Sequence, residues 1–257
     1  MNEQVPAPTP GGASEAGFNR EGKACPSGAG VEWWTKAWPL FTRQAGMWIA
    51  VIVVTLVIFV IASIIPVVGQ LAVLLFSPVI AGGLMLGARE VDRGASITIG
   101  HVFAGFSNQM GQLVLIGVIY LAGMVVAAII VALIAGVGIG TMLVGAHGTP
   151  NPAVVGAAGA TGFLLAILIA AALMLPLYMA MWFAPALVVF HELGAVDAMK
   201  ASFSGCLRNI VPFILYGLVG LVLGIVASIP FGLGWLVLGP VAIASVYVGY
   251  RDIYLAS

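Results

Sequence analysis

The sequence predicts an all-α integral membrane protein, a polytopic bundle of six transmembrane helices arranged as three hairpins. Only 7% of its 257 residues are charged and 62% are hydrophobic, whereas a soluble domain carries about 25% charged residues. The charged residues occur in four short parts of the chain, and the long stretches between them contain no Asp, Glu, Lys or Arg. A chain with so little charge cannot cover a water-facing surface, so we expect its helices to face lipid.

Each apolar stretch is long enough to cross a bilayer as a helix. A hydrocarbon core of about 30 Å needs about 17–25 helical residues, and a helix satisfies the backbone of a single segment within lipid. The six expected spans are 46–65, 71–88, 112–139, 162–190, 212–229 and 233–250. We expect Pro78, Pro176, Pro185 and Pro240 to kink the second, fourth and sixth spans.

The positive charges predict the orientation of these spans. All nine Lys and Arg lie in the N-terminal segment, the second-to-third loop, the fourth-to-fifth loop or the C-terminus. Loops rich in Lys and Arg remain in the cytoplasm, so both termini are predicted to be cytoplasmic. Residues 1–30 are rich in Pro, Gly and Ala, which predicts a disordered cytoplasmic tail before a membrane domain of residues 31–257.

The segments before the first, third and fifth spans share an apolar pattern. Its residues recur in steps of four, three and four, which places them on one face of a helix. The three stripes are Trp34, Trp38, Phe41, Ala45; Ile99, Phe103, Phe106, Met110; and Met199, Phe203, Cys206, Ile210. We expect cytoplasmic amphipathic helices, which act either as plain anchors, the favoured interpretation, or as surfaces that sense lipid or dock a partner.

The same segments indicate an internal repeat. At an offset of 100 residues, Gly94, Phe103 and Gly105 align with Gly194, Phe203 and Gly205. At an offset of 162, Pro78 and Arg89 align with Pro240 and Arg251. The sequence therefore predicts one unit used three times as a direct repeat: an amphipathic helix, a span, a turn and a returning span. The fourth span fits this unit least well, because Pro176 and Pro185 do not reproduce the spacing from proline to arginine.

The polar residues do not form a pattern typical of catalysis. The sequence contains no P-loop, no GxSxG elbow and no paired carboxylates. We expect no catalytic residue, cofactor or metal site, because Cys25, Cys206, His101, His147 and His191 form no ligand cluster. With a net charge of zero, we also expect no binding of nucleic acid.

Four arginines lie at the ends of predicted helices: Arg43, Arg89, Arg208 and Arg251. We interpret them as determinants of topology and as complements of the helix dipole; the alternative is a ring that binds anionic lipid or substrate. Gly220 and Gly224 form a GxxxG pair, which is typical of close helix packing.

Several segments carry a resemblance to a known family: WFAPALVVFHELGAVDAMKASFSGCLRNIVPFILYG, SIPFGLGWLVLGPV, ASVYVGYRDIY and FSPVIAGGLM. They resemble a family of bacterial inner-membrane proteins of unknown function, similar in layout to the membrane domain fused to some glycerophosphodiester phosphodiesterases. The resemblance covers residues 33–254 and implies the inner membrane of a Gram-negative bacterium. It brings no catalytic residues, and the catalytic barrel of the phosphodiesterases is absent from this sequence.

The sequence leaves three functions open. The favoured one is a non-enzymatic protein that organises the cytoplasmic face of the membrane, or binds lipids or partners there. The expected partners are the lipid bilayer and a membrane protein or a second copy of this chain. The alternatives are a small transporter or flippase-like protein that uses the kinked spans, and a membrane domain that works with a separate hydrolase.

Overall fold

The computed structural model describes residues 17–145 and 152–256. Six helices in this part of the chain are long and apolar enough to cross a membrane, as the sequence predicted. They are α2 (Ala45–Ser63), α3 (Val68–Asp92), α5 (Met110–Gly145), α6 (Pro152–Trp182) with its continuation α7 (Ala184–His191), α9 (Ile210–Ser228) and α10 (Trp235–Tyr254).

Two helices continue at their C-terminal ends beyond the apolar segments from which they were predicted. The α3 helix continues to Asp92 and α10 to Tyr254, because a helical backbone can run on through charged residues once it leaves the hydrocarbon. The α3 helix continues through Pro78, and the α10 helix continues through Pro240. An interruption lies at Phe183, between α6 and α7, where Pro185 is the second residue of the new helix.

Shorter helices precede each pair of spans: α1 (Ala29–Thr42), the 3-10 helix η1 (Ile99–Val102) with α4 (Ala104–Ser107), and α8 (Ala195–Arg208). The single helix expected over the second apolar stripe is wrong, since the chain breaks at Phe103 and again before Met110. Tight packing on α3 explains the first break. A side chain at Gly105 would overlap the carbonyl oxygen of Val79, so α4 lies directly against the α3 backbone.

The apolar stripes also differ from the prediction in what they contact. Trp34, Phe41, Met199 and Cys206 are buried in the protein core, whereas Trp38 is exposed. All four residues of the second stripe are exposed. The first and third short helices therefore pack into the fold and do not only rest on a membrane surface.

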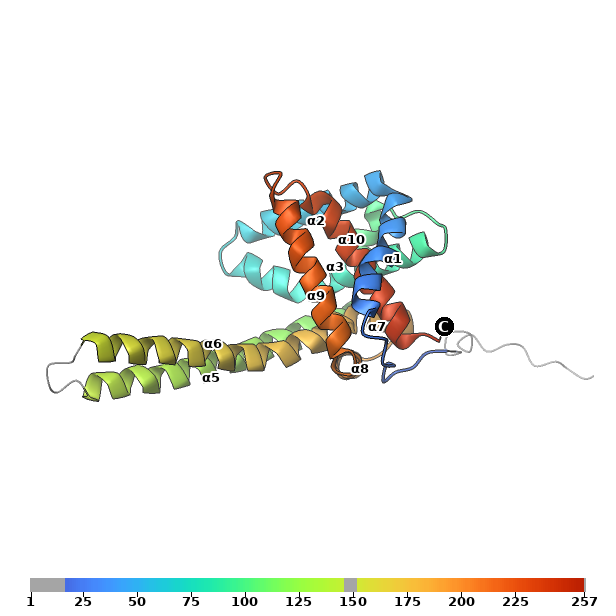
Figure 1. The fold of residues 1–257 in the computed structure, drawn as a ribbon. Helices are drawn as coiled ribbons and strands as arrows, with labels where there is room; N and C mark the ends of the chain where they lie inside the picture. Colours follow the sequence, from blue (N-terminus) through green and yellow to red (C-terminus); the bar gives the residue numbers. More distant parts are fainter. Residues whose placement is uncertain (1–16, 146–151, 257) are drawn as a thin grey trace, which may run out of the picture.

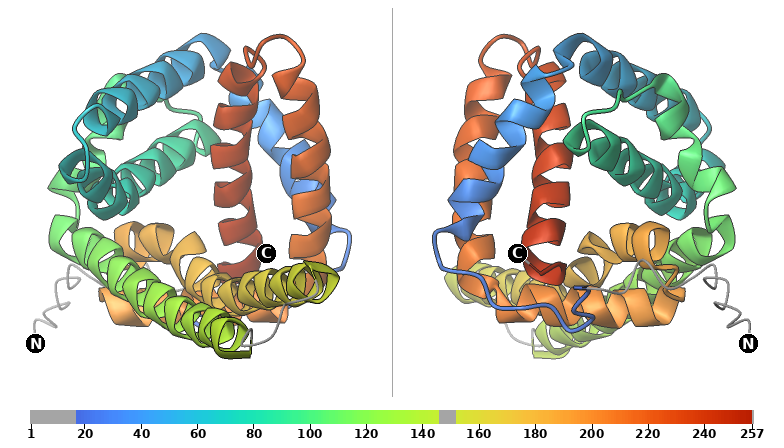
Figure 2. Two further views of the ribbon diagram at one scale, coloured as in Figure 1. Left: turned by 90° about the vertical axis from the view of Figure 1, so that its left-hand side faces the viewer. Right: turned by 90° about the vertical axis from the view of Figure 1, so that its right-hand side faces the viewer.

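The three hairpins form the three sides of a rough triangle, with α2–α3, α5–α6 and α9–α10 each making one side (Figure 2). The α5–α6 hairpin projects furthest from the rest (Figure 1). Residues 161–182 of α6 contain no buried side chain, whereas α5 buries Leu113, Ile116 and Ala127. The core lies at the opposite end, where α1 packs on α9 and α10, and α3 packs on α5 and α7. The largest side chains there are Trp33, Trp48, Phe183 and Tyr254, all with 0–1% of their surface exposed.

The segment of residues 17–28, hereafter the N-terminal strap, runs along the C-terminal end of α10 and across α8. Phe18 forms an isolated β-bridge with Leu255, Arg20 pairs with Asp197 at 3.0 Å, and the ammonium of Lys23 donates to the Leu255 carbonyl. This part of the predicted disordered tail is therefore packed on the protein, because the fold offers it specific polar partners. Residues 1–16 of that predicted tail lie outside the described residues.

Candidate functional site

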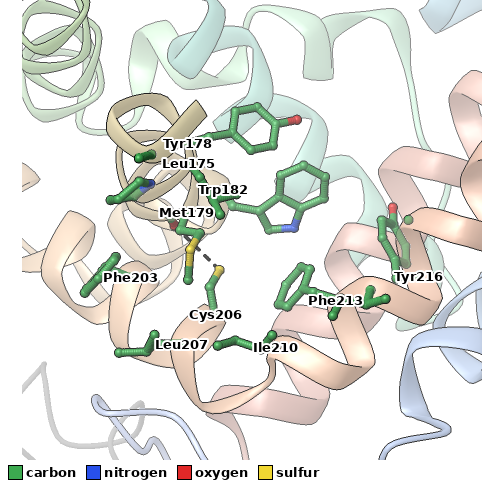
Figure 3. A pocket seen from close by; sticks show the side chains of 14 residues that line it. Leu175, Tyr178, Met179, Trp182, Phe203, Cys206, Leu207, Ile210, Phe213 and Tyr216 are labelled. Carbon is green, nitrogen blue, oxygen red and sulfur yellow. Dashed lines mark hydrogen bonds between the residues drawn. The ribbon is translucent and has the colours of Figure 1, made fainter. Parts of the chain in front are cut away.

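A cavity of about 660 Å³ lies between the C-terminal part of α6, the C-terminal part of α8 and the start of α9 (Figure 3). It is lined by Ala172, Leu175, Pro176, Tyr178, Met179, Trp182, Phe203, Cys206, Leu207, Ile210, Phe213, Ile214, Tyr216 and Gly217, and is hereafter the α6–α8–α9 groove. Its volume is within the roughly 300–1,000 Å³ typical of small-molecule sites. No charged side chain is among its lining residues.

The groove depends on α8 being fixed to the end of α6. The Ser202 side chain on α8 is fully buried, and its hydroxyl donates to the Met179 carbonyl at 2.7 Å. The same hydroxyl accepts from the backbone N–H of Phe183 at 2.9 Å. Phe183 is the residue at which α6 is interrupted, so Ser202 satisfies a donor that the interruption leaves without a helical partner.

Aromatic rings form one wall of the groove. The ring of Trp182 meets the rings of Phe213 and Tyr216 edge to face, at 6.0 Å between centroids in both pairs. The Tyr216 hydroxyl is hydrogen-bonded to Ser245 on α10 at 2.8 Å, which fixes this ring from behind. In Figure 3, Met179 and Trp182 of α6 face Ile210 and Phe213 of the α8–α9 segment across the cavity.

The groove is closed at its floor and open at its rim. Cys206 and Tyr216 are only 3% and 8% exposed, whereas Leu175 and Ile214 at the rim are 62% and 57% exposed. Burial raises the pKa of the Cys206 thiol to about 12, so the thiol stays protonated and is a poor nucleophile. The arrangement offers an apolar surface for binding and no group suited to covalent chemistry at its floor.

The four arginines singled out in the sequence have separate protein partners. Arg251 pairs with Asp92 at 2.7 Å, and Arg208 pairs with Glu21 at 2.5 Å. Arg43 donates to the Val91 carbonyl at 3.3 Å, and the guanidinium of Arg89 lies 4.7 Å from the centroid of the Phe190 ring. These contacts tie helix ends to one another or, for Arg208, to the N-terminal strap, which favours a structural role over a common ligand site.

The described histidines and the GxxxG pair also contact other residues of this chain. His191 is hydrogen-bonded to the Tyr250 hydroxyl at 2.7 Å, His101 caps η1 through Thr98, and His147 lies outside the described residues. Within residues 17–145 and 152–256, no three His, Cys, Asp or Glu side chains lie together so as to hold a metal ion. Gly220 faces the ring of Trp34, and Gly224 faces that of Trp235, so this pair packs on aromatic rings of its own chain.

Sequence reasoning did not find the α6–α8–α9 groove. Phe203, Cys206 and Ile210 were predicted as one apolar face of a helix, and they do line the groove. Their partners on α6 lie 21 or more residues earlier in the chain, and nothing in the sequence pairs the two segments. The one local signal was Pro176, which was recognised as a departure from the repeat.

Comparisons with known proteins identify one relative. A probable inner membrane protein of Burkholderia thailandensis is 31% identical to this chain in an alignment of 205 residues that covers 76% of this chain and 73% of the relative. No model of a protein family matches the chain, and no solved structure matches it.

Proposed function

Since this chain belongs to the family of the probable inner membrane protein of Burkholderia thailandensis, we propose that it binds a membrane lipid in the α6–α8–α9 groove. It is a multi-pass protein of the bacterial inner membrane, with six helices able to span the bilayer. The proposed role is non-enzymatic: the protein holds a lipid, or organises lipid and partners, at the cytoplasmic face. The observation that carries this proposal is an open groove with an apolar rim and an aromatic wall.

The place of the groove along the spans supports this role. It is formed by the last part of α6 and the first part of α9, next to α8, and the N-terminal strap crosses the same helix. The positive-inside rule assigns this end of the bundle to the cytoplasm. A lipid of the cytoplasmic leaflet could therefore enter the groove from the side without crossing the membrane.

The chemistry of the lining favours a lipid over a polar solute. A polar solute would lose hydrogen bonds to water without gaining partners in an apolar cavity, at a cost of several kcal/mol. A small transporter would be expected to have a polar cavity beside its kinked spans, whereas the groove beside Pro176 is apolar. The sequence also led to two further proposals. One is that the layout is similar to that of the membrane domain of glycerophosphodiester phosphodiesterases, and the other is that the protein works with a separate hydrolase.

We also propose that the three hairpins are direct repeats of one unit, and amide side chains support this idea. Gln44, the N-cap of α2, accepts from the Ile97 N–H at 3.0 Å and donates to the Ala95 carbonyl. Gln112, near the start of α5, accepts from the Ala195 N–H at 2.8 Å. Asn209, the N-cap of α9, accepts from the Cys25 N–H at 2.7 Å. Gln44 and Gln112 each bind backbone just before or at the start of the next short helix in the chain. Asn209 binds backbone just before α1, the first of these short helices.

Filling the groove tests the proposed function. A Cβ atom built at Gly217, on the groove, meets nothing within 4 Å, and the same holds for Gly162, on the membrane-exposed part of α6 away from the groove. Gly217→Trp should therefore occupy the groove without disturbing the backbone, and Gly162→Trp is its matched control. Phospholipid that remains bound after purification in detergent is counted by native mass spectrometry.

The wild-type protein and Gly162→Trp should retain one phospholipid per chain. The Gly217→Trp variant should retain it with at least about tenfold lower occupancy, which corresponds to a loss of about 1.4 kcal/mol. The proposal is overturned if the wild type retains no lipid, or if Gly217→Trp retains as much as the control.

A further inference from the structure

We propose that the lipid in the α6–α8–α9 groove is an anionic phospholipid, with an acyl chain in the groove and its phosphate paired with Lys200. This inference rests on the proposed function and names the headgroup that the same site selects. The argument comes from the register of α8 and from the partners of the other charged residues around it.

Lys200 lies on the face of α8 that lines the groove. Phe203 and Leu207 both line it, and Lys200 precedes them by three and seven residues, which is the spacing of one helical face. Lys200 is therefore one turn beyond the groove, toward the N-terminal end of α8, and its side chain is exposed. A lysine at this position can lay its methylene groups along apolar surface and extend its ammonium to the level of the headgroups.

The charge of Lys200 is available to a ligand. In the described part of the chain it forms no ion pair or hydrogen bond, whereas neighbouring charges are neutralised. Asp197, the acidic residue of α8, pairs with Arg20 at 3.0 Å. Arg208, at the other end of α8, pairs with Glu21 and also donates to the Gly22 carbonyl.

Among the described residues, Arg89 and Arg93 also lack an ion pair or a hydrogen bond, but both lie at the end of α3, a helix that contributes no residue to the groove. The guanidinium of Arg89 lies against the Phe190 ring. Lys200 is therefore a free positive charge one helical turn from the apolar groove. This combination is complementary to a lipid with an apolar chain and a negative phosphate, and cationic sites of this kind on the cytoplasmic side of membrane proteins bind anionic headgroups.

A competition between two phospholipids tests the inference. The delipidated protein in detergent is given equal amounts of phosphatidylglycerol, which is anionic, and phosphatidylethanolamine, which is zwitterionic. Native mass spectrometry then measures the ratio of the two bound species. The wild type should prefer phosphatidylglycerol about fivefold, the effect expected of one lysine near an anionic headgroup.

Charge removal at Lys200 should abolish the preference without abolishing binding. Lys200→Gln should bring the ratio to about one while total bound lipid stays at the wild-type level, and Lys200→Arg should keep the preference. The matched control is Lys36→Gln, since Lys36 is exposed but pairs with Glu32 at 2.9 Å and with Asp252 at 3.4 Å; its preference should be unchanged.

The outcomes distinguish this inference from the function on which it rests. If the wild type and Gly162→Trp bind neither phospholipid, the lipid-binding function itself fails. If both phospholipids bind and Lys200→Gln has the same ratio as the wild type, lipid binding stands and the role of Lys200 is overturned.

Discussion

Asn209 fixes the N-terminal strap to the junction of α8 and α9, and its removal should loosen the strap selectively. Its side chain is fully buried. The Oδ1 atom accepts from the Cys25 N–H at 2.7 Å, and the Nδ2 atom donates to the Lys23 carbonyl at 2.9 Å and to the Gly205 carbonyl at 2.8 Å. Two of these three hydrogen bonds reach the strap, across more than 180 residues of sequence.

The size of the effect follows from those two hydrogen bonds. A typical intramolecular hydrogen bond contributes about 0.5–1.5 kcal/mol net, so Asn209→Ala should lower the free energy of strap opening by about 1–3 kcal/mol. Since about 1.4 kcal/mol is tenfold in an equilibrium constant, the open fraction should rise about 5- to 150-fold. The third bond lies within the α8–α9 junction, so its loss should add a smaller decrease in overall stability.

Trypsin cleavage after Arg20 and Lys23 reports this opening. When opening and closing are fast relative to cleavage, the cleavage rate follows the open fraction. Asn209→Ala should therefore be cleaved in the strap about 5- to 150-fold faster than the wild type. Asn108→Ala is the control, because Asn108 donates only to the nearby Ala104 carbonyl and is exposed. Equal cleavage in the two variants, or faster cleavage at every site of the Asn209 variant, would refute the reasoning.

Two further predictions concern packing and protonation. Gly105→Leu should destabilise the protein by about 1–3 kcal/mol through overpacking, seen as a lower melting temperature in detergent, because any Cβ there overlaps the Val79 carbonyl; Gly111→Ala, whose Cβ meets nothing within 4 Å, should have no such effect. In a Cys25→Ser background, maleimide labelling of Cys206 should rise roughly tenfold per pH unit up to about pH 10 without a plateau, since burial raises its pKa from 9.0 to about 12. The folded state then binds the proton more tightly than the unfolded state, so thermal stability should fall as pH rises above about 9; a labelling plateau near pH 9 would contradict the burial of the thiol.

The sequence was sufficient to predict the six spans because lipid imposes a simple requirement on each of them. The expected ranges 46–65 and 212–229 lie within two residues of α2 and α9. This agreement arises because a charge-free apolar run of bilayer length has one stable backbone form in lipid. The ends of α3 and α10 were missed by four residues each, since the helix continues there into charged residues that an apolar pattern excludes.

The strap and the groove could not be predicted, because both depend on contacts between distant segments. The strap is held by hydrogen bonds to backbone groups of Lys23 and Cys25. Every residue type carries these groups, so the amino-acid sequence does not indicate which of them form such bonds. The groove depends on the Ser202 hydroxyl, which joins α8 to the interruption at Phe183. In the sequence, Ser202 is one small polar residue in an amphipathic helix and carries no sign of its partner.

The fourth span departs from the proposed repeat beside the α6–α8–α9 groove. In α3 and α10, a buried proline precedes an arginine by eleven residues, Pro78 before Arg89 and Pro240 before Arg251. The second hairpin instead has Pro176 within α6 and an interruption at Phe183. The α6 helix packs on α5 and α8, and α8 packs on α9, so α8 spans the distance between α6 and α9. A natural protein departs from its own local rules most often where function requires it, and Pro176 lies on the wall of the groove. Pro176, which departs from the proposed repeat, thus lines the groove that we propose binds a lipid. The proposed binding function therefore belongs to the junction of α6 with α8 and α9, and not to every unit of the proposed repeat.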